Sequence, residues 1–392
     1  MSATTLGIYI HIPFCAKKCD YCDFYSLAGA DGARMDDYLA ALLRHMRETA
    51  ALTGKNSSKT GGWSADTLYI GGGTPSLFGA QRVKKLVSAV KSLWNMPKSA
   101  EITMEANPDS LDFQSMRKLR KAGVNRLSIG VQATQPGLLA SLGRIHTGEQ
   151  AADCVRGARR AGFENISVDL MYGLPGQTTE MLFESINTVK EWGVTHLSLY
   201  GLKIEDGTPL AARNVSLPDE AEQADQYLSC AGLLKSLGFG QYEISNFALP
   251  SYQSRHNLKY WTLGSYIGFG AAAHSDFGGN RYGHVRDIDA YIAGVKSGDA
   301  VIDEISRISP LERAGEYIML GLRTARGVSG NEYTRVYKVS FDAIEKKLEK
   351  FEKYGLCERT AERWHLTPKG FLVSNRILSE LLESKVDGAL AP

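Results

Sequence analysis

Three cysteines near the start of the chain, Cys15, Cys19 and Cys22, fall within eight consecutive residues with the spacing C-x3-C-x2-C. A short loop with this spacing can turn all three sulfur atoms toward one metal centre. Thiolates favour zinc, Cu(I) and iron–sulfur clusters as partners. A four-iron cluster usually takes four cysteines, so three leave one iron open to chemistry. The spacing favours an iron–sulfur cluster over two alternatives that stay open: a structural zinc site completed by His11, and a chance grouping.

The residues around the cysteines carry a resemblance to a known family. Tyr9 precedes the run His-Ile-Pro-Phe-Cys that ends at Cys15, and Tyr21 stands just before the last cysteine. This arrangement resembles the radical S-adenosylmethionine (SAM) proteins, and specifically the oxygen-independent coproporphyrinogen III oxidase family, over nearly the whole chain. In these proteins three cysteines hold a 4Fe-4S cluster and SAM chelates the fourth iron. The resemblance therefore implies both cofactors, with the three cysteines as metal ligands.

Further residues match the family's contacts to SAM. The run Gly-Gly-Gly-Thr-Pro at 71–75 follows an expected strand, and residues without a Cβ let the backbone approach a ligand closely. Carboxylates suit the ribose hydroxyls and the sulfonium, and an arginine suits a carboxylate. For any one of the polar residues taken alone, capping a helix or pairing with a neighbour is the favoured interpretation, but Glu105, Gln132, Arg144 and Asp169 together match in order and spacing and favour the site. The resemblance implies this set of SAM contacts: Tyr9, Tyr21, Gly72, Gly73, Thr74, Glu105, Gln132, Arg144 and Asp169. In the oxidase, part of the set (Gln132, Arg144 and Asp169) serves a second SAM.

Two departures separate the relatives within this family. The oxidase carries a fourth cysteine two residues after the third, whereas this chain has Phe24, as the HemW-type haem chaperones do. The segment His256-Asn257-x-x-Tyr260-Trp261 resembles one linked to haem binding in those chaperones, and imidazole is a good axial ligand for haem iron. A histidine buried in a glycine- and aromatic-rich packing region remains the alternative, and His274 and His284 are further candidates.

The resemblance implies a haem chaperone that binds haem and passes it to haem-accepting, respiratory proteins. The alternative function is that of an oxygen-independent coproporphyrinogen III oxidase, a radical SAM enzyme of porphyrin biosynthesis; no catalytic residue can be named. The net charge of +2 gives no support for nucleic-acid binding. We expect a cytoplasmic protein, because the start of the chain lacks a signal-peptide pattern and no apolar run is long enough to span a membrane. A chaperone serving membrane acceptors could still touch the membrane peripherally.

An α/β fold follows from the pattern of elements. The length of 392 residues suggests two domains, or one large domain with an appendage. Helical segments alternate with six expected strands, which indicates parallel βα units whose carboxyl ends carry the polar site residues. The expected strands are Leu6–His11, Ala65–Ile70, Glu101–Met104, Arg126–Gly130, Asn165–Leu170 and Thr195–Tyr200. We expect Thr147 and Thr178 to cap helices, and Gly123 to end one.

Three regions are expected along the chain. The resemblance implies an incomplete (β/α)6 radical SAM barrel over residues 1–237, which contains a polar loop at 54–64 and ends in a helix at Leu217–Leu237. A glycine- and aromatic-rich connecting region follows at 238–304 and holds the His256 segment. Residues 305–385 form a smaller, mainly helical, winged-helix-like domain that we interpret as a packing or lid module. Its expected elements are helices at Pro310–Leu322, Ser329–Tyr337 and Phe341–Tyr354, a hairpin at Cys357–Arg359 and Arg363–Leu366, and a last helix at Pro368–Glu383.

Overall fold

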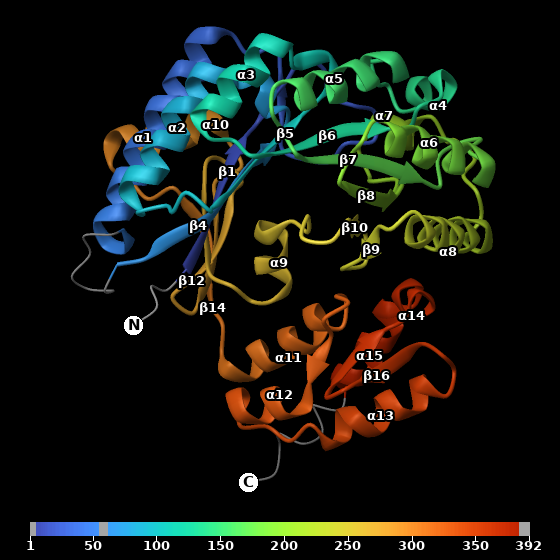
Figure 1. The fold of residues 1–392 in the computed structure, drawn as a ribbon. Helices are drawn as coiled ribbons and strands as arrows, with labels where there is room; N and C mark the ends of the chain where they lie inside the picture. The colour runs from blue at the N-terminus through green and yellow to red at the C-terminus, as the bar shows by residue number, and fades with distance from the viewer. Residues whose placement is uncertain (1–4, 55–61, 384–392) are drawn as a thin grey trace.

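The computed structural model describes residues 5–54 and 62–383, and a 12-stranded sheet organises most of them (Figure 1). Its centre is a run of six parallel strands that lie side by side in chain order. They are β1 (Thr5–Ile12), β4 (Ser64–Gly72), β5 (Glu101–Ala106), β6 (Arg126–Gln132), β7 (Asn165–Tyr172) and β8 (His196–Gly201). All six expected strands are confirmed, and with them the incomplete (β/α)6 barrel. Of the expected loop at 54–64, residues 55–61 lie outside the described residues.

Helices that lie between these strands, or that follow β8 in the chain, cover the outer face of the sheet (Figure 1). The expected caps are confirmed: Thr147 forms a capping box with Gln150, Thr178 accepts from the Met181 amide, and Gly123 ends its helix in the left-handed conformation. The helices are α1 (Gly32–Thr53), α2 (Ala80–Leu93), α3 (Phe113–Ala122), α4 (Pro136–Ser141), α5 (Gly148–Arg160), α6 (Thr179–Glu191), α7 (Pro209–Ala212) and α8 (Glu220–Ser236). Helix α8 begins later than the expected 217, because Asp219 caps it rather than lying in its first turn.

The region at 238–304 adds strands to both sides of the barrel sheet and then leads into the C-terminal body. Strands β10 (Asn246–Ala248) and β9 (Gly240–Gln241) extend the sheet beyond β8. On the opposite side β11 (Tyr266–Phe269) lies parallel to β1 and is followed by β12 (His274–Phe277), β13 (Asn280–His284) and β14 (Ile302–Arg307). Two helices belong to this region, α9 (Arg255–Trp261) and α10 (Ile288–Ser297). The His256 segment therefore lies on a short helix packed beside the barrel.

The C-terminal residues form a smaller body with its own apolar core, placed next to α8 and α9 (Figure 1). Its elements are α11 (Pro310–Gly321), β15 (Val328–Ser329), α12 (Gly330–Tyr337), α13 (Asp342–Glu352), β16 (Cys357–Thr360), β17 (Arg363–Leu366), α14 (Pro368–Leu372) and α15 (Ser374–Glu383). The expected hairpin is confirmed, and β15 joins it to make a three-stranded sheet. The prediction of a single helix over 368–383 is wrong. The chain breaks at Val373, so that Phe371 of α14 and Leu378 of α15 both reach the same core.

Short strands and helices hold the amino-terminal cysteine loop against the end of the barrel. Strand β2 (Phe14–Cys15) pairs with β3 (Leu27–Ala28), and the short helices η1 (Pro75–Phe78) and η2 (Pro108–Ser110) follow β4 and β5. Phe14 stacks on Phe78 with ring centroids 5.8 Å apart, and both rings are fully buried. The cysteine loop is therefore anchored on the main core at the carboxyl ends of the strands. Within the described ranges, every helix is too short or too polar to cross a membrane.

Candidate cofactor site at the mouth of the barrel

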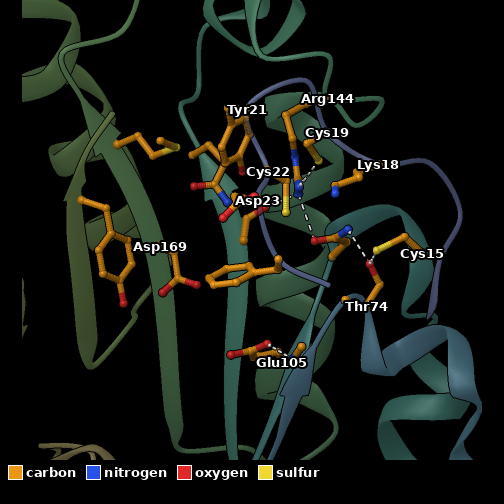
Figure 2. A pocket seen from close by; sticks show the side chains of 18 of the residues that line it. Cys15, Lys18, Cys19, Tyr21, Cys22, Asp23, Thr74, Glu105, Arg144 and Asp169 are labelled. Atoms are coloured by element: carbon orange, nitrogen blue, oxygen red, sulfur yellow. Dashed lines mark hydrogen bonds between the residues drawn. The ribbon is translucent and has the colours of Figure 1, made fainter. Parts of the chain in front are cut away.

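A cavity of about 500 Å³ opens at the carboxyl ends of the parallel strands, under the cysteine loop (Figure 2). All the predicted site residues except Tyr9 and His256 line it. These residues are Cys15, Cys19, Tyr21, Cys22, Gly72, Gly73, Thr74, Glu105, Gln132, Arg144 and Asp169. Residues from five segments that are far apart in the sequence thus share one cavity, as expected for the ligand-binding end of a parallel barrel.

The three cysteines are half-buried at the wall of this cavity, and side chains of the barrel donate hydrogen bonds to the sulfur atoms of two of them. The Thr74 hydroxyl donates to Cys15 Sγ at 3.5 Å, and Arg144 Nη1 donates to Cys19 Sγ at 3.2 Å. Figure 2 shows Cys19 and Cys22 on the side of Arg144, and Cys15 beside Thr74. A hydroxyl and a guanidinium stabilise thiolate, which is the form of cysteine that binds metals.

His11 does not complete a zinc site with these cysteines. The residue is only 7% exposed, and both ring nitrogens have partners: Nδ1 lies 2.9 Å from the Tyr9 hydroxyl and Nε2 lies 3.0 Å from the Tyr25 carbonyl oxygen. Burial lowers the pKa of His11 and keeps the imidazole neutral. In the described part of the chain, no three His, Cys, Asp or Glu side chains surround a position for a single ion. The zinc alternative therefore lacks its fourth ligand, whereas a 4Fe-4S cluster with one open iron would need only the three cysteines.

The glycine turn after β4 presses against the cysteine loop. Gly72 has φ +120°, and a Cβ there would lie 2.7 Å from the His11 ring. A Cβ on Gly73 would lie 2.8 Å from the Phe14 carbonyl oxygen and 2.9 Å from Cys15 Sγ. Both contacts are too close for any larger residue, so the packing of the loop itself requires these two glycines.

Two buried carboxyl groups, Glu105 and Asp169, lie on the strand side of the cavity (Figure 2). Glu105 accepts hydrogen bonds from the Tyr69 hydroxyl at 2.7 Å and from the Gly72 amide at 3.0 Å. Burial raises the pKa of Glu105 to about 7 and also raises the pKa of Asp169. Carboxyl groups that are costly to ionise gain from a cationic ligand, and the sulfonium of SAM is one.

Gln132 has a strained backbone conformation, and Arg144 has a buried N–H group without a hydrogen-bond partner. Both features are common at binding sites. Gln132 ends β6 in the left-handed region, with φ +68°, where the register with β7 shifts. Arg144 Nη2 donates to the Gly130 carbonyl oxygen at 2.6 Å and to Asn107 Oδ1 at 3.0 Å, while its buried Nε has no hydrogen-bond partner. A buried guanidinium with a spare donor fits a site completed by an anionic ligand group, such as the SAM carboxylate.

Asn107 is a site residue that the sequence reasoning missed. Its side chain links Arg144 to the hydroxyl of Thr74 by donating to Thr74 Oγ1 at 3.2 Å. It thereby connects the two groups that contact cysteine sulfurs. The sequence contained a signal for it, because Asn107 comes two residues after Glu105 and directly follows the end of β5.

Tyr9 and His256 lie outside the cofactor cavity, along a smaller cavity of about 230 Å³ inside the barrel. His256 is 0% exposed, and burial lowers its pKa to about 3. Its Nδ1 lies 2.8 Å from Thr67 Oγ1, and its Nε2 lies 2.7 Å from the Tyr260 hydroxyl. Both ring nitrogens are therefore engaged, and the role of His256 as a haem ligand stays a prediction that requires one of these hydrogen bonds to break.

The chain is similar in sequence to known protein families. Models of the Radical SAM superfamily and of the HemN C-terminal domain match residues 9–189 and 308–373. The heme chaperone HemW of Bacillus subtilis (strain 168) is 36% identical and covers 95% of this chain and 98% of its own length. The corresponding HemW proteins of Lactococcus lactis (strain IL1403) and Escherichia coli (strain K12) are 34% and 33% identical, covering 95% and 96% of this chain and 96% and 98% of their own lengths.

The chain belongs to the HemW family. A solved structure, the radical SAM enzyme coproporphyrinogen III oxidase (HemN) from Escherichia coli, has the same fold. It superposes with a TM-score of 0.84 at 22% identity and covers 97% of this chain and 90% of that chain.

Membership of the radical SAM superfamily implies a 4Fe-4S cluster and SAM, and the residues of the HemW-family cavity fit both groups. Three partly exposed thiols suit three irons, and the bare turn at Gly72 and Gly73 gives the space next to them. The buried carboxyls and the spare Arg144 donor suit the cationic and anionic ends of SAM. We take Cys15, Cys19 and Cys22 as the residues that would hold the cluster.

Proposed function

We propose that this chain is a haem chaperone that binds a 4Fe-4S cluster, SAM and haem, and delivers the haem to acceptor proteins. The observation that carries the proposal is similarity over the full length to proteins named heme chaperone HemW. Phe24 supports it, because this residue stands where the oxidase has its fourth cysteine and is 70% exposed beside the cofactor cavity.

The chain's own residues would bind and orient the two cofactors. The three cysteines would hold the cluster, and Thr74 and Arg144 donate hydrogen bonds to the sulfur atoms of Cys15 and Cys19. Glu105 and Asp169 offer carboxylates to the SAM ribose and sulfonium, and Tyr21 covers the cavity from the loop. When bound, the cluster would supply an electron to SAM, which is chemistry that belongs to the cofactor and not to the protein.

The partners in this proposal are haem and haem-accepting respiratory proteins, with peripheral membrane contact where an acceptor is membrane-bound. The cytoplasm is the proposed location, because its reducing conditions preserve thiols and clusters. The C-terminal body packs beside α9 and the barrel, which suits a packing or lid role better than nucleic-acid reading at a net charge of +2.

The test starts from anaerobic purification, with iron, sulfide and haem measured together after reconstitution. We expect about four irons per chain, stoichiometric binding of haem, and transfer of that haem to a haem-free b-type cytochrome. Cys19→Ser should lose the cluster and weaken SAM binding, and Cys154→Ser, which changes a buried thiol of α5, is the matched control. Conversion of coproporphyrinogen III by the reconstituted protein, or failure to bind haem, would refute the chaperone proposal.

A further inference from the structure

A second cavity, of about 380 Å³, lies next to the cofactor cavity and shares Asp23 and Phe24 with it. It is formed by β1, the end of the cysteine loop, α9 and the strands β11 and β12. Its lining residues are Tyr9, His11, Asp23, Phe24, Tyr25, Tyr260, Tyr266, Ala272, His274 and Arg286. Most of these side chains are aromatic, and the lining also contains one guanidinium, Arg286, and one carboxylate, Asp23.

We propose that haem binds in this second cavity, with His274 as an axial ligand of the iron and Arg286 paired with a propionate. This inference rests on the proposed chaperone function and assigns the place where that function holds its cargo. It also assigns the axial ligand to a histidine outside the His256 segment.

The geometry of His274 is that of an available ligand. Its side chain is 53% exposed, and Nδ1 lies 3.5 Å from Glu304 Oε1, while Nε2 has no hydrogen bond within the described residues. Metal-binding histidines usually place one ring nitrogen against a carboxylate, which orients the other nitrogen toward the metal. His256 offers no such free nitrogen, since both of its ring nitrogens are hydrogen-bonded.

The strand next to His274 leaves room for its ring. Residue 283 is directly opposite His274 on β13 and is a glycine. A Cβ at Gly283 would lie 2.9 Å from His274 Cε1, so the imidazole rests over bare backbone. A methyl group at this position would push the ring out of its place without removing the ligand.

The walls of the cavity suit a flat, anionic macrocycle. Tyr260 and Tyr266 pack edge to face with centroids 4.6 Å apart, and Phe24 adds a largely exposed ring from the cysteine loop. Aromatic side chains offer large, rigid apolar surfaces to a planar ligand. Arg286 is exposed and forms no ion pair or side-chain hydrogen bond in the described residues, which leaves its guanidinium free for a carboxylate.

This assignment gives His256 a different role. Tyr260 lines the haem cavity, and its hydroxyl is held by His256 Nε2 at 2.7 Å. We therefore assign His256 as a positioning residue that sets the Tyr260 ring. Loss of its imidazole would weaken haem binding without changing the axial ligand.

The experiment titrates ferric haem into the reconstituted full chain and follows the Soret band and the electron paramagnetic resonance spectrum. We expect His274→Ala to bind haem about tenfold or more weakly and to lose the imidazole-ligated signature, which added imidazole should restore. Gly283→Ala should weaken that signature as well. His256→Ala should keep it while binding haem less tightly. His365→Ala is the matched control, because His365 also faces a carboxylate, Glu358 at 3.0 Å, but on β17 of the C-terminal body.

The propionate contact has its own test. The wild-type chain should prefer haem over haem dimethyl ester, and Arg286→Gln should erase this preference. An unchanged ligand signature in His274→Ala, together with its loss in His256→Ala, would overturn the assignment while leaving the chaperone function standing. If the wild-type chain binds no haem at all, the chaperone proposal itself falls, so the two failures are distinguishable.

Discussion

The buried carboxyl of Glu105 makes the affinity for SAM depend on pH near neutrality. Burial raises its pKa to about 7 in the cofactor-free protein, and its two hydrogen-bond donors, Tyr69 and the Gly72 amide, only partly offset that cost. If SAM binds the ionised form, the apparent Kd is multiplied by one plus the ratio of protonated to ionised carboxyl. That factor is about 11 at pH 6 and about 1.1 at pH 8, so SAM should bind about tenfold more tightly at pH 8.

The same carboxyl also couples the stability of the cofactor-free protein to pH. Its pKa is raised from 4.5 in the unfolded chain to about 7 in the folded protein, so ionisation destabilises the fold as the pH rises through this window. Linkage gives a loss of about 2 kcal/mol in the free energy of unfolding between about pH 5.5 and about pH 8.5. Glu105→Gln removes this loss, because the amide does not titrate.

Isothermal titration with SAM on the reconstituted protein, and urea unfolding of the cluster-free protein, measure the two effects. Each is compared between wild type and Glu105→Gln across the pH range, so that groups titrating in SAM itself cancel. The variant should bind SAM more weakly at pH 8 and should show a flatter pH profile in both assays. Parallel profiles for the two proteins, in binding and in unfolding, would refute the assigned pKa and the contact between this carboxylate and SAM.

Two further perturbations test the packing of the site and of the second body. Gly73→Ala puts a Cβ 2.9 Å from Cys15 Sγ, so it should lower the iron content and cost about 1–3 kcal/mol of stability. Gly137→Ala is the control, because a Cβ there would have no atom within 4 Å. Equal iron content in the two variants would contradict the argument. Arg313 donates from both terminal nitrogens to Asp276, at 2.7 and 2.9 Å, and ties α11 to β12. Arg313→Met should cost about 1–2 kcal/mol in urea unfolding, whereas Arg156→Met, which breaks an exposed pair with Asp153, should change it little.

The sequence predicted the parallel barrel because the signals for it are local. Strand patterns, the Thr147 and Thr178 caps and the terminating Gly123 each act within a few residues, and all are confirmed. The polar residues were expected together because parallel strands end at one edge of a sheet. The cavity does bring Glu105 and Asp169 close to the cysteine loop.

What the sequence could not predict depends on partners far along the chain. The ring of His256 is held by Thr67, which is 189 residues away, and no local pattern distinguishes such a buried imidazole from a ligand. The pairing of β11 with β1 is equally remote and turns an expected connecting region into part of the sheet. The left-handed conformation of Gln132 arises where the register between β6 and β7 shifts, and the helix break at Val373 arises from packing on the C-terminal core. Neither follows from the preferences of the residues themselves.

The two cavities beside the cysteine loop are lined by different kinds of side chain, and this difference suits two different ligands. Glu105 and Asp169 suit the cationic sulfonium of SAM, while Lys17, Lys18, Arg144 and Lys203 in the same cavity balance its acidic side chains. The neighbouring cavity instead offers the Tyr260 and Tyr266 rings and the unpaired Arg286. Phe24 lines both cavities, so the position that holds a cysteine in the oxidase here contributes apolar surface to the proposed haem cavity. In this proposal haem lies beside the cluster, and of the lining residues only Asp23 and Phe24 belong to both cavities.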